Sequence, residues 1–244
     1  MIFKSLSVIF PLLNEEKRLT YAFNDIQKFN KKKLVKKLEY IFVDDGSTDN
    51  SFKIIKEFIS KNSSKNIRYK SIKLKKNFGK GYALKIGVKN SSYEWILTID
   101  TDISVSLLEL LYWKKKNYIK NHQDNLIYFG SRSMKDSKIN YKFYRKFLGF
   151  IFSSFVRLLF NTELKDTQCG FKLYKSNIAK NIFSKIQSHR FTHDVEILNL
   201  AKKFEIEIQE TPVNWSHKKN SKLNIIFDSF KMFIDLIDIK LKIK

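Results

Sequence analysis

The chain has 244 residues, of which 47 are Lys or Arg and 24 are Asp or Glu, so its formal net charge is +23. This length suits one large α/β domain with a substantial core, and the single cysteine, Cys169, excludes a disulfide framework and favours a reducing compartment. No secretory signal pattern opens the chain and no apolar stretch has the length needed to cross a bilayer, so we expect a soluble or peripheral protein.

The positive charge is carried mainly by lysine, because only six of the 47 basic residues are arginine. Lysine is spread over nearly every segment, whereas nucleic-acid recognition relies on arginine forks and on aromatic-basic modules that this sequence lacks. An anionic membrane surface explains a diffuse lysine excess at least as well. We therefore predict no nucleic-acid partner and a cytoplasmic protein at the cytoplasmic face of a membrane, with a basic nucleic-acid-binding protein as the alternative from another class.

The first half of the chain alternates between expected strands and expected helices. In chain order these are a strand over 5–10, a helix over 14–29, a strand over 38–43, a helix from Thr48 or Asp49 to about 60, a strand over 67–74, a helix over 81–89, a strand over 94–99, a helix opening near Ser106 and a strand over 126–130. This alternation predicts an α/β fold with a mostly parallel sheet that helices cover on both faces.

The pattern changes after Ser131. We expect a helix over 141–160, a loop entering a strand over 166–174, a helix over 194–204 and a strand over 206–210. The tail over 223–243 has apolar residues along one stripe of a helix, which suits either a cap on the core or a position at a membrane interface. We therefore divide the chain into a main domain over 1–222 and a C-terminal amphipathic helix over 223–244.

Two acidic clusters follow apolar strands in this otherwise basic chain. Asp44 and Asp45 come directly after 40–43, and Asp100 and Asp102 come after 95–99. The carboxyl ends of parallel strands meet at one edge of a sheet, which is where open α/β sheets bind ligands. Gathered carboxylates repel one another unless a cation lies between them, and a hard divalent cation that also holds a diphosphate fits this need. The pattern indicates a nucleotide-linked substrate, although either cluster alone is also typical of a turn.

Seven segments, taken in order, resemble the signatures of family 2 inverting glycosyltransferases with the Rossmann-like GT-A fold. They lie at 10–15, 43–49 (Val-Asp-Asp-Gly-Ser-Thr-Asp), 77–81, 100–102 (Asp-Thr-Asp), 130–132, 166–172 (Asp-Thr-Gln-Cys-Gly-Phe-Lys) and 194–198. Within that family the segment 166–172, Arg190 ahead of Asp194 and the segment 212–215 are most similar to polyprenyl-phosphate (dolichyl-phosphate) glucosyltransferases. Each element is weak alone, but seven in the right order are strong evidence.

The resemblance implies transfer of a hexose, most naturally glucose, from a nucleoside diphosphate sugar, with UDP favoured over GDP. The implied donor site comprises Pro11, Asn14, Glu15, Asp44, Asp45, Gly79, Lys80, Asp100, Thr101 and Asp102. Asp100 and Asp102 flank one residue on an extended segment, so both side chains can reach one Mg²⁺ or Mn²⁺ from the same face. Lys80, between two glycines, offers an ammonium to a phosphate, or is one more surface lysine.

On the acceptor side the resemblance implies a polyprenyl phosphate. Arg132 and Arg145 are the expected phosphate ligands, although Arg145 also fits an ion pair on a helix face. Gln168 and Cys169 are expected to shape the pocket where sugar and acceptor meet.

The acidic residues Asp194 and Glu196 are expected near the acceptor, and the expected catalytic residues are Asp194, Arg132 and Asp102. Asp194 is a candidate base or electrostatic orienter, or simply a helix cap. A lipid phosphate is already anionic and needs positioning rather than deprotonation, whereas a glycan or other hydroxyl acceptor needs a true base. A non-catalytic relative that only binds the nucleotide is a further alternative.

Overall fold

The computed structural model describes residues 1–62, 64, 66–119, 125–140, 153–188, 192–218, 236 and 240. Its centre is a seven-stranded sheet with the strand order β3-β2-β1-β4-β7-β5-β8. The strands are β1 (Phe3–Leu12), β2 (Val35–Asp44), β3 (Ile67–Lys73), β4 (Trp95–Thr98), β5 (Leu126–Ser131), β7 (Lys172–Lys175) and β8 (Glu207–Pro212). Neighbouring strands are parallel except where β7 pairs with β4 and β5. The prediction of a mostly parallel α/β sheet is confirmed.

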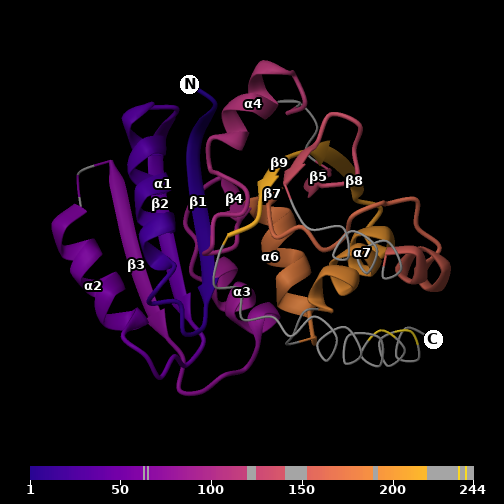
Figure 1. The fold of residues 1–244 in the computed structure, drawn as a ribbon. Helices are drawn as coiled ribbons and strands as arrows, with labels where there is room; N and C mark the ends of the chain where they lie inside the picture. The colour runs from indigo at the N-terminus through magenta and orange to yellow at the C-terminus, as the bar shows by residue number, and fades with distance from the viewer. Residues whose placement is uncertain are drawn as a thin grey trace.

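Helices cover both faces of this sheet (Figure 1). They are α1 (Leu19–Lys31), α2 (Ser51–Asn62), α3 (Lys80–Lys89), α4 (Glu109–Lys115), α6 (Ser176–Lys185) and α7 (His193–Lys203). Side chains of α1, α2 and α4 pack into one apolar core, and side chains of α3, α6 and α7 pack into another. A small second sheet joins β6 (Lys138–Asn140) to β9 (Asn214–Ser216) in parallel.

The two cores lie on opposite faces of the sheet because successive side chains of a strand point in opposite directions. In β1, Val8 and Phe10 belong to the core under α1, α2 and α4, whereas Ile9 belongs to the other core. All three side chains are fully buried, as expected for the central strands of a sheet covered on both sides. The central strands therefore form a rigid base from which the loops at their carboxyl ends project.

The structure differs from the sequence-based elements in several places. Helix α1 begins at Leu19 rather than Asn14, because Asn14 has a positive φ of 54° that a helix does not accommodate. The antiparallel direction of β7, the helix α6 and the small β6–β9 sheet were not predicted. Short strands such as β6 and β9, three residues each, carry too few residues to show a periodic pattern.

Parts of the sequence-based account lie outside the described residues. The expected helix over 141–160 is described only from residue 153, where residues 153–160 are helical. Arg145, Arg190 and nearly all of the C-terminal segment 223–244 are not among the described residues, so the division at 222 remains a prediction. Within the part of the chain that is described, no helix combines the length and apolar character that a bilayer crossing requires.

Candidate active site

The end of β1 lies between the two acidic clusters and joins them at one edge of the sheet. Leu12 pairs with Asp44 in the register of β1 and β2, and the Leu12 carbonyl accepts the backbone N–H of Asp45 at 2.8 Å. On the other side, the Thr101 hydroxyl donates to the Pro11 carbonyl at 2.9 Å. The segments that carry Asp44, Asp45, Asp100 and Asp102 therefore meet at the carboxyl ends of adjacent parallel strands.

The carboxylates of Asp44 and Asp45 organise the first cluster. Asp45 accepts the backbone N–H groups of Phe78 at 2.8 Å and Gly79 at 2.7 Å, so it anchors the loop before α3. Asp44 is fully buried, and its Oδ1 accepts the backbone N–H of Ser47 at 2.9 Å. Its Oδ2 is buried with no hydrogen-bond partner among the described residues. A buried carboxylate oxygen without a donor is unfavourable, so this atom suits a donor supplied by a ligand.

The turn after β1 connects the first cluster to the second. Its Asn14 N–H donates to the Ser47 hydroxyl at 2.8 Å. Glu15 forms an ion pair with Arg18, and the Arg18 Nη1 lies 3.5 Å from Asp102 Oδ2. Sequence reasoning missed Arg18, although the scarcity of arginine in this chain was a usable signal.

Asp100 and Asp102 differ in electrostatic environment. Lys80 Nζ lies 2.6 Å from Asp100 Oδ1, and although burial alone would raise the pKa of Asp100, the Lys80 charge holds it below its ordinary value. The pKa of Asp102 is raised, first by burial and then by the neighbouring Asp100 charge. The backbone N–H of Ser104, 2.9 Å away, and the charge of Arg18 lower this pKa but do not cancel the rise. Lys80 is thus part of the site rather than a solvated surface lysine.

The second cluster offers hard oxygen ligands. Carboxylate oxygens are the ligands that Mg²⁺ and Mn²⁺ prefer, and burial and the neighbouring Asp100 raise the pKa of Asp102, an effect that a bound cation would offset. The described residues contain no cluster of three or more His, Cys, Asp or Glu able to hold a metal by itself. Asp100 and Asp102 would therefore hold such a cation only together with ligands from outside the described residues.

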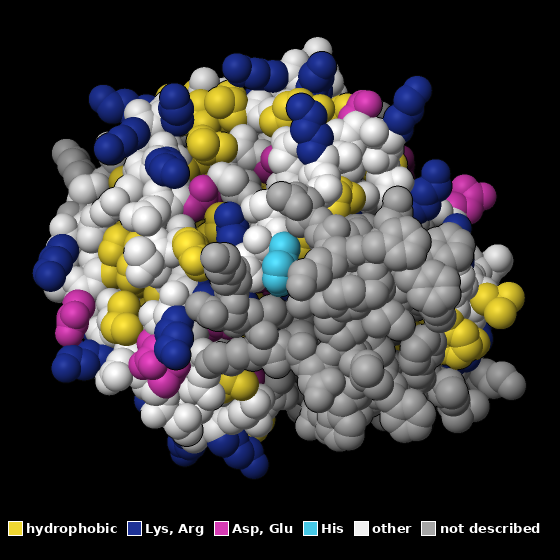
Figure 2. All heavy atoms as spheres, in the orientation of Figure 1, with side chains coloured by type: hydrophobic (Ala, Val, Ile, Leu, Met, Phe, Trp, Pro, Cys, Tyr) yellow, Lys and Arg dark blue, Asp and Glu magenta, His cyan; other side chains and the backbone are white. Residues whose placement is uncertain are grey.

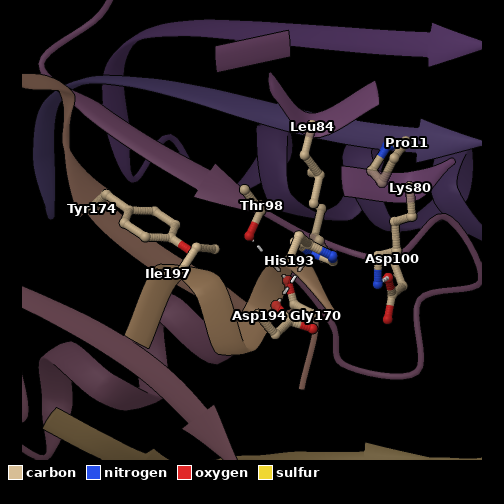
Figure 3. A pocket seen from close by; sticks show the side chains of 11 residues that line it. Pro11, Lys80, Leu84, Thr98, Asp100, Gly170, Tyr174, His193, Asp194 and Ile197 are labelled. Atoms are coloured by element: carbon tan, nitrogen blue, oxygen red, sulfur yellow. Dashed lines mark hydrogen bonds and ion pairs between the residues drawn. The ribbon is translucent and has the colours of Figure 1, made fainter. Parts of the chain in front are cut away.

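A first pocket extends from Asp100 into the protein below the sheet edge. Figure 3 shows Lys80 and Asp100 at one end, Tyr174 at the other, and His193 and Asp194 between them. This pocket gathers an ammonium, carboxylates and an imidazole around an otherwise apolar floor.

Asp194 is buried and is held by two neighbours. It forms an ion pair with Lys172, and its Oδ1 lies 3.2 Å from His193 Nε2. Burial alone would raise the pKa of Asp194, but His193 and then Lys172 keep it well below its ordinary value. The N-cap residue of α7 is Thr192, so the helix-cap interpretation of Asp194 was wrong. Sequence reasoning interpreted His193 as structural and assigned no role to Lys172, which lies within the segment 166–172 but is one of too many lysines to stand out.

A second pocket lies on the other side of Asp100. Its lining includes Arg132, Gln168, Cys169 and Trp215 together with Asp100. Three residues predicted for the acceptor side thus come together beside a residue predicted for the donor. Burial raises the pKa of Cys169 to about 12, so its thiol stays protonated and is unsuited to act as a nucleophile.

Arg132 is oriented by a carboxylate behind it. Its Nε and Nη2 donate to Asp166 Oδ2 and Oδ1 at 2.7 Å and 2.8 Å, the two-pronged geometry that arginine forms with carboxylates. The charge of Arg132 outweighs the effect of burial and lowers the pKa of Asp166. This pair fixes the guanidinium at the wall of the second pocket.

The predicted acceptor residue Glu196 lies elsewhere. Its carboxylate accepts the backbone N–H groups of Gln187 at 2.8 Å and Ser188 at 2.7 Å, and it lines neither pocket. It holds the segment that follows α6, so the structure gives it an anchoring role. Arg145, the other predicted phosphate ligand, lies outside the described residues.

Behind Asp100, Gly170 allows the segment 166–172 to approach closely. A Cβ atom at this position would lie 2.5 Å from Asp100 Oδ2, and the Thr98 hydroxyl donates to the Gly170 carbonyl at 3.1 Å. Gly170 lines both pockets, as does Asp100. The two pockets therefore share one carboxylate and one glycine.

Comparison with known proteins identifies the family of this chain. The family described as Glycosyl transferase family 2 matches residues 7–183. Dolichyl-phosphate beta-glucosyltransferase of Dictyostelium discoideum is 38% identical over 244 residues, covering 97% of this chain and 74% of that protein. The protein of the same name from Homo sapiens is 34% identical, covering 98% and 76%.

Two solved structures show the shared fold. Glucosyl-3-phosphoglycerate synthase from Mycobacterium tuberculosis, in complex with Mn²⁺ and UDP-glucose, superposes with a TM-score of 0.63 at 17% identity, over 97% of this chain and 79% of that one. S. aureus TarS 1-349, in complex with UDP-GlcNAc, gives a TM-score of 0.56 at 16% identity, over 95% and 65%. The expected GT-A fold is confirmed, and the chain belongs to glycosyl transferase family 2.

Proposed function

We propose that this enzyme transfers glucose, with inversion, from UDP-glucose to a polyprenyl phosphate such as dolichyl phosphate. Two observations outside the site support this: relatives named dolichyl-phosphate beta-glucosyltransferases align over nearly the whole chain, and solved structures of the same fold contain UDP-sugars. The observation that carries the proposal is that Asp100, a residue predicted for the donor side, lines one pocket together with Arg132, Gln168 and Cys169, which are predicted for the acceptor side.

The donor half of the reaction rests on both acidic clusters. The buried Asp44 Oδ2 accepts a hydrogen bond from the nucleoside, which satisfies the atom that has no partner among the described residues. Asp100 and Asp102 would hold a Mg²⁺ or Mn²⁺ ion, which would neutralise the diphosphate and stabilise the charge that develops on the leaving nucleotide. Lys80, now 2.6 Å from Asp100, supplies a further positive charge within reach of the same phosphates.

On the acceptor side, Arg132 binds the phosphate of the polyprenyl phosphate, in the orientation set by Asp166. A phosphate oxygen then attacks the anomeric carbon of glucose from the face opposite the diphosphate. The bond from that carbon to the diphosphate oxygen breaks, and UDP leaves with the bonding electron pair. No proton has to be removed from a dianionic phosphate, so positioning and charge neutralisation carry this step.

The buried ion pair of Asp194 argues against a hydroxyl acceptor. A glycan hydroxyl needs a general base that is available to take its proton, but Asp194 is paired with His193 and Lys172, which lower its pKa below the ordinary value. We infer that Asp194 acts as a fixed anion that accepts hydrogen bonds from sugar hydroxyls. Because the proposed acceptor is a membrane lipid, we further propose a peripheral position at the cytoplasmic membrane face.

An assay with labelled nucleotide sugars, a short-chain polyprenyl phosphate and either Mn²⁺ or a chelator tests the proposal. We expect glucose to transfer from UDP-glucose with β configuration, and only when the metal is present. Transfer to oligosaccharides instead of the lipid phosphate would contradict the acceptor assignment. Binding of UDP-glucose without transfer to any acceptor would indicate the non-catalytic alternative.

A further inference from the structure

Phe171 and Trp215 are the aromatic side chains that line the second pocket. Phe171 is buried, whereas Trp215, on β9, is only partly buried. The other lining groups near Asp100 include the guanidinium of Arg132 and the amide of Gln168. A phosphate that carries an apolar chain requires a cation for its head and an apolar surface directly beside it. Trp215 lines the same pocket as Arg132 and can supply such a surface.

The position of Trp215 is tied to the loop that carries the second acidic cluster. Trp215 forms an antiparallel bridge with Val105, and the backbone N–H of Ser216 donates to the Ser104 carbonyl at 2.8 Å. On its other side, Trp215 pairs with Ile139 in the small β6–β9 sheet. The indole is partly buried and packs against the main core. Its backbone is therefore held in register with the segment directly after Asp100 and Asp102.

A buried carboxyl group reinforces this arrangement. Glu109, on α4, is 4% exposed, and both of its carboxylate oxygens accept from Asn214 Nδ2 at 3.1 Å. No ion pair of Glu109 occurs among the described residues, and burial raises its pKa to about 6. A buried carboxylate without a cation is unfavourable, whereas its hydrogen bonds to the residue next to Trp215 fix the orientation of β9.

We propose that Trp215 is the apolar wall against which the first isoprene unit of the acceptor packs, and that Glu109 is a positioning residue that sets this wall through Asn214. The inference rests on the proposed function and extends it by naming what reads the lipid part of the acceptor.

Steady-state kinetics with two acceptors, a short-chain polyprenyl phosphate and methyl phosphate, test the role of Trp215. We expect Trp215→Ala to raise the KM for the polyprenyl phosphate about tenfold, the loss that corresponds to removing an aromatic contact of moderate size. Trp215→Leu, which keeps an apolar side chain and serves as the second variant, should give a smaller rise. The KM for UDP-glucose, the rate of UDP-glucose hydrolysis and the KM for methyl phosphate should not change.

The result separates this inference from the proposed function. If Trp215→Ala weakens UDP-glucose binding, slows hydrolysis, or affects both acceptors equally, Trp215 contacts the sugar or acts on the fold alone, and the inference is wrong while the proposed function stands. If the unaltered enzyme uses neither phosphate acceptor but hydrolyses UDP-glucose, the proposed function fails, and this inference fails with it.

A pair of exchanges tests Glu109 as a positioning residue. Glu109→Gln alone should raise the KM for the polyprenyl phosphate about threefold without changing the KM for UDP-glucose, since an amide offers Asn214 only one acceptor atom. Combining Glu109→Gln with Asn214→Asp restores a matched donor and acceptor pair with the same net charge, and should return the KM toward its original value. A KM for the polyprenyl phosphate that Glu109→Gln leaves unchanged, or that the combined exchange does not lower again, would overturn the positioning role.

Discussion

The buried surroundings of Asp194 limit the chemical roles that this carboxylate can have. It contacts Lys172 and His193, and Lys172 in turn is 1% exposed with its Nζ 4.6 Å from the centre of the Phe129 ring. Such an arrangement keeps both charges in place, because removing either one leaves the other buried and unpaired. The sequence indicated an acid near this place, but its partners come from β7 and the start of α7, which no local pattern connects.

Replacing Asp194 with asparagine separates a fixed anion from a general base. We expect Asp194→Asn to lower transfer to a polyprenyl phosphate by about tenfold, because an amide still accepts hydrogen bonds from the sugar while the charge is lost. A true base would show a loss of more than about a thousandfold. Because Lys172 is left unpaired, unfolding by urea should show a destabilisation of about 3 kcal/mol, and rates are to be compared at temperatures where the variant is folded.

Arg132 provides the matched contrast. We expect Arg132→Ala to reduce transfer by more than about a hundredfold with UDP-glucose binding retained, since the acceptor phosphate loses its main ligand. Arg132→Lys keeps the charge but not the two-pronged contact with Asp166, so it should recover only part of the activity. The measurement is the rate of transfer at increasing acceptor concentrations up to saturation. If Arg132→Ala and the original enzyme have equal rates throughout, this assignment is contradicted.

At the scale of elements, the segment 166–172 acts through the close contact between Gly170 and Asp100. Its Cβ position lies within 2.5 Å of Asp100 Oδ2, so Gly170→Ala must displace this carboxylate. We expect a drop in kcat/KM for UDP-glucose of about a hundredfold with the overall fold retained. Gly87→Ala is the control, because there the added Cβ meets the Ile9 side chain at 2.4 Å within the core and should reduce stability more than donor binding.

The contact between α4 and β9 predicts a pH dependence of stability. Glu109 has a pKa of about 6 in the folded protein against 4.5 ordinarily, so the folded state binds its proton more tightly than the unfolded state. Protonated Glu109 therefore contributes to the free energy of unfolding in full below pH 4.5, and this contribution is lost as the pH rises through 6. Between pH 5 and pH 7.5 the original protein should lose about 1 kcal/mol of this contribution, whereas Glu109→Gln has no carboxyl group to lose it from. The free energy of unfolding of the variant minus that of the original protein should therefore rise by the same amount over this range. Glu57→Gln, which removes a carboxylate at an exposed site, is the matched control variant.

The elements that sequence patterns revealed are the long and periodic ones. The four parallel strands from β1 to β4 follow apolar runs in the sequence, and the helices between them follow helical spacing. The predicted ends of these strands were enough to predict that Asp44, Asp45, Asp100 and Asp102 lie at one edge of the sheet. Strand β7 inserts between β4 and β5 in the opposite direction, which depends on pairing between distant segments rather than on local composition. The roles of Arg18, Lys172 and Trp215 depend on the same long-range contacts.

At the scale of the whole molecule, the acids and bases are unevenly arranged. In the described part of the face that Figure 2 shows, Lys and Arg side chains are scattered without a continuous stripe, whereas the acids at the sheet edge are close together and wholly or partly buried. A diffuse positive surface raises the local concentration of anionic substrates and lipids without selecting among them. Selection then falls to the pockets around Asp100, and the absence of a nucleic-acid partner stays a prediction.

The most direct test of the account is whether the two acidic clusters bind one nucleoside diphosphate through a shared cation. Calorimetric titration of UDP and of uridine, with and without Mn²⁺, answers this for the original enzyme, Asp44→Asn and Asp102→Asn. We predict that Mn²⁺ strengthens UDP binding at least about tenfold but leaves uridine binding unchanged, that Asp102→Asn abolishes this enhancement, and that Asp44→Asn weakens both ligands alike. A UDP affinity that changes neither when Mn²⁺ is added nor when Asp102 is replaced by Asn would contradict the account.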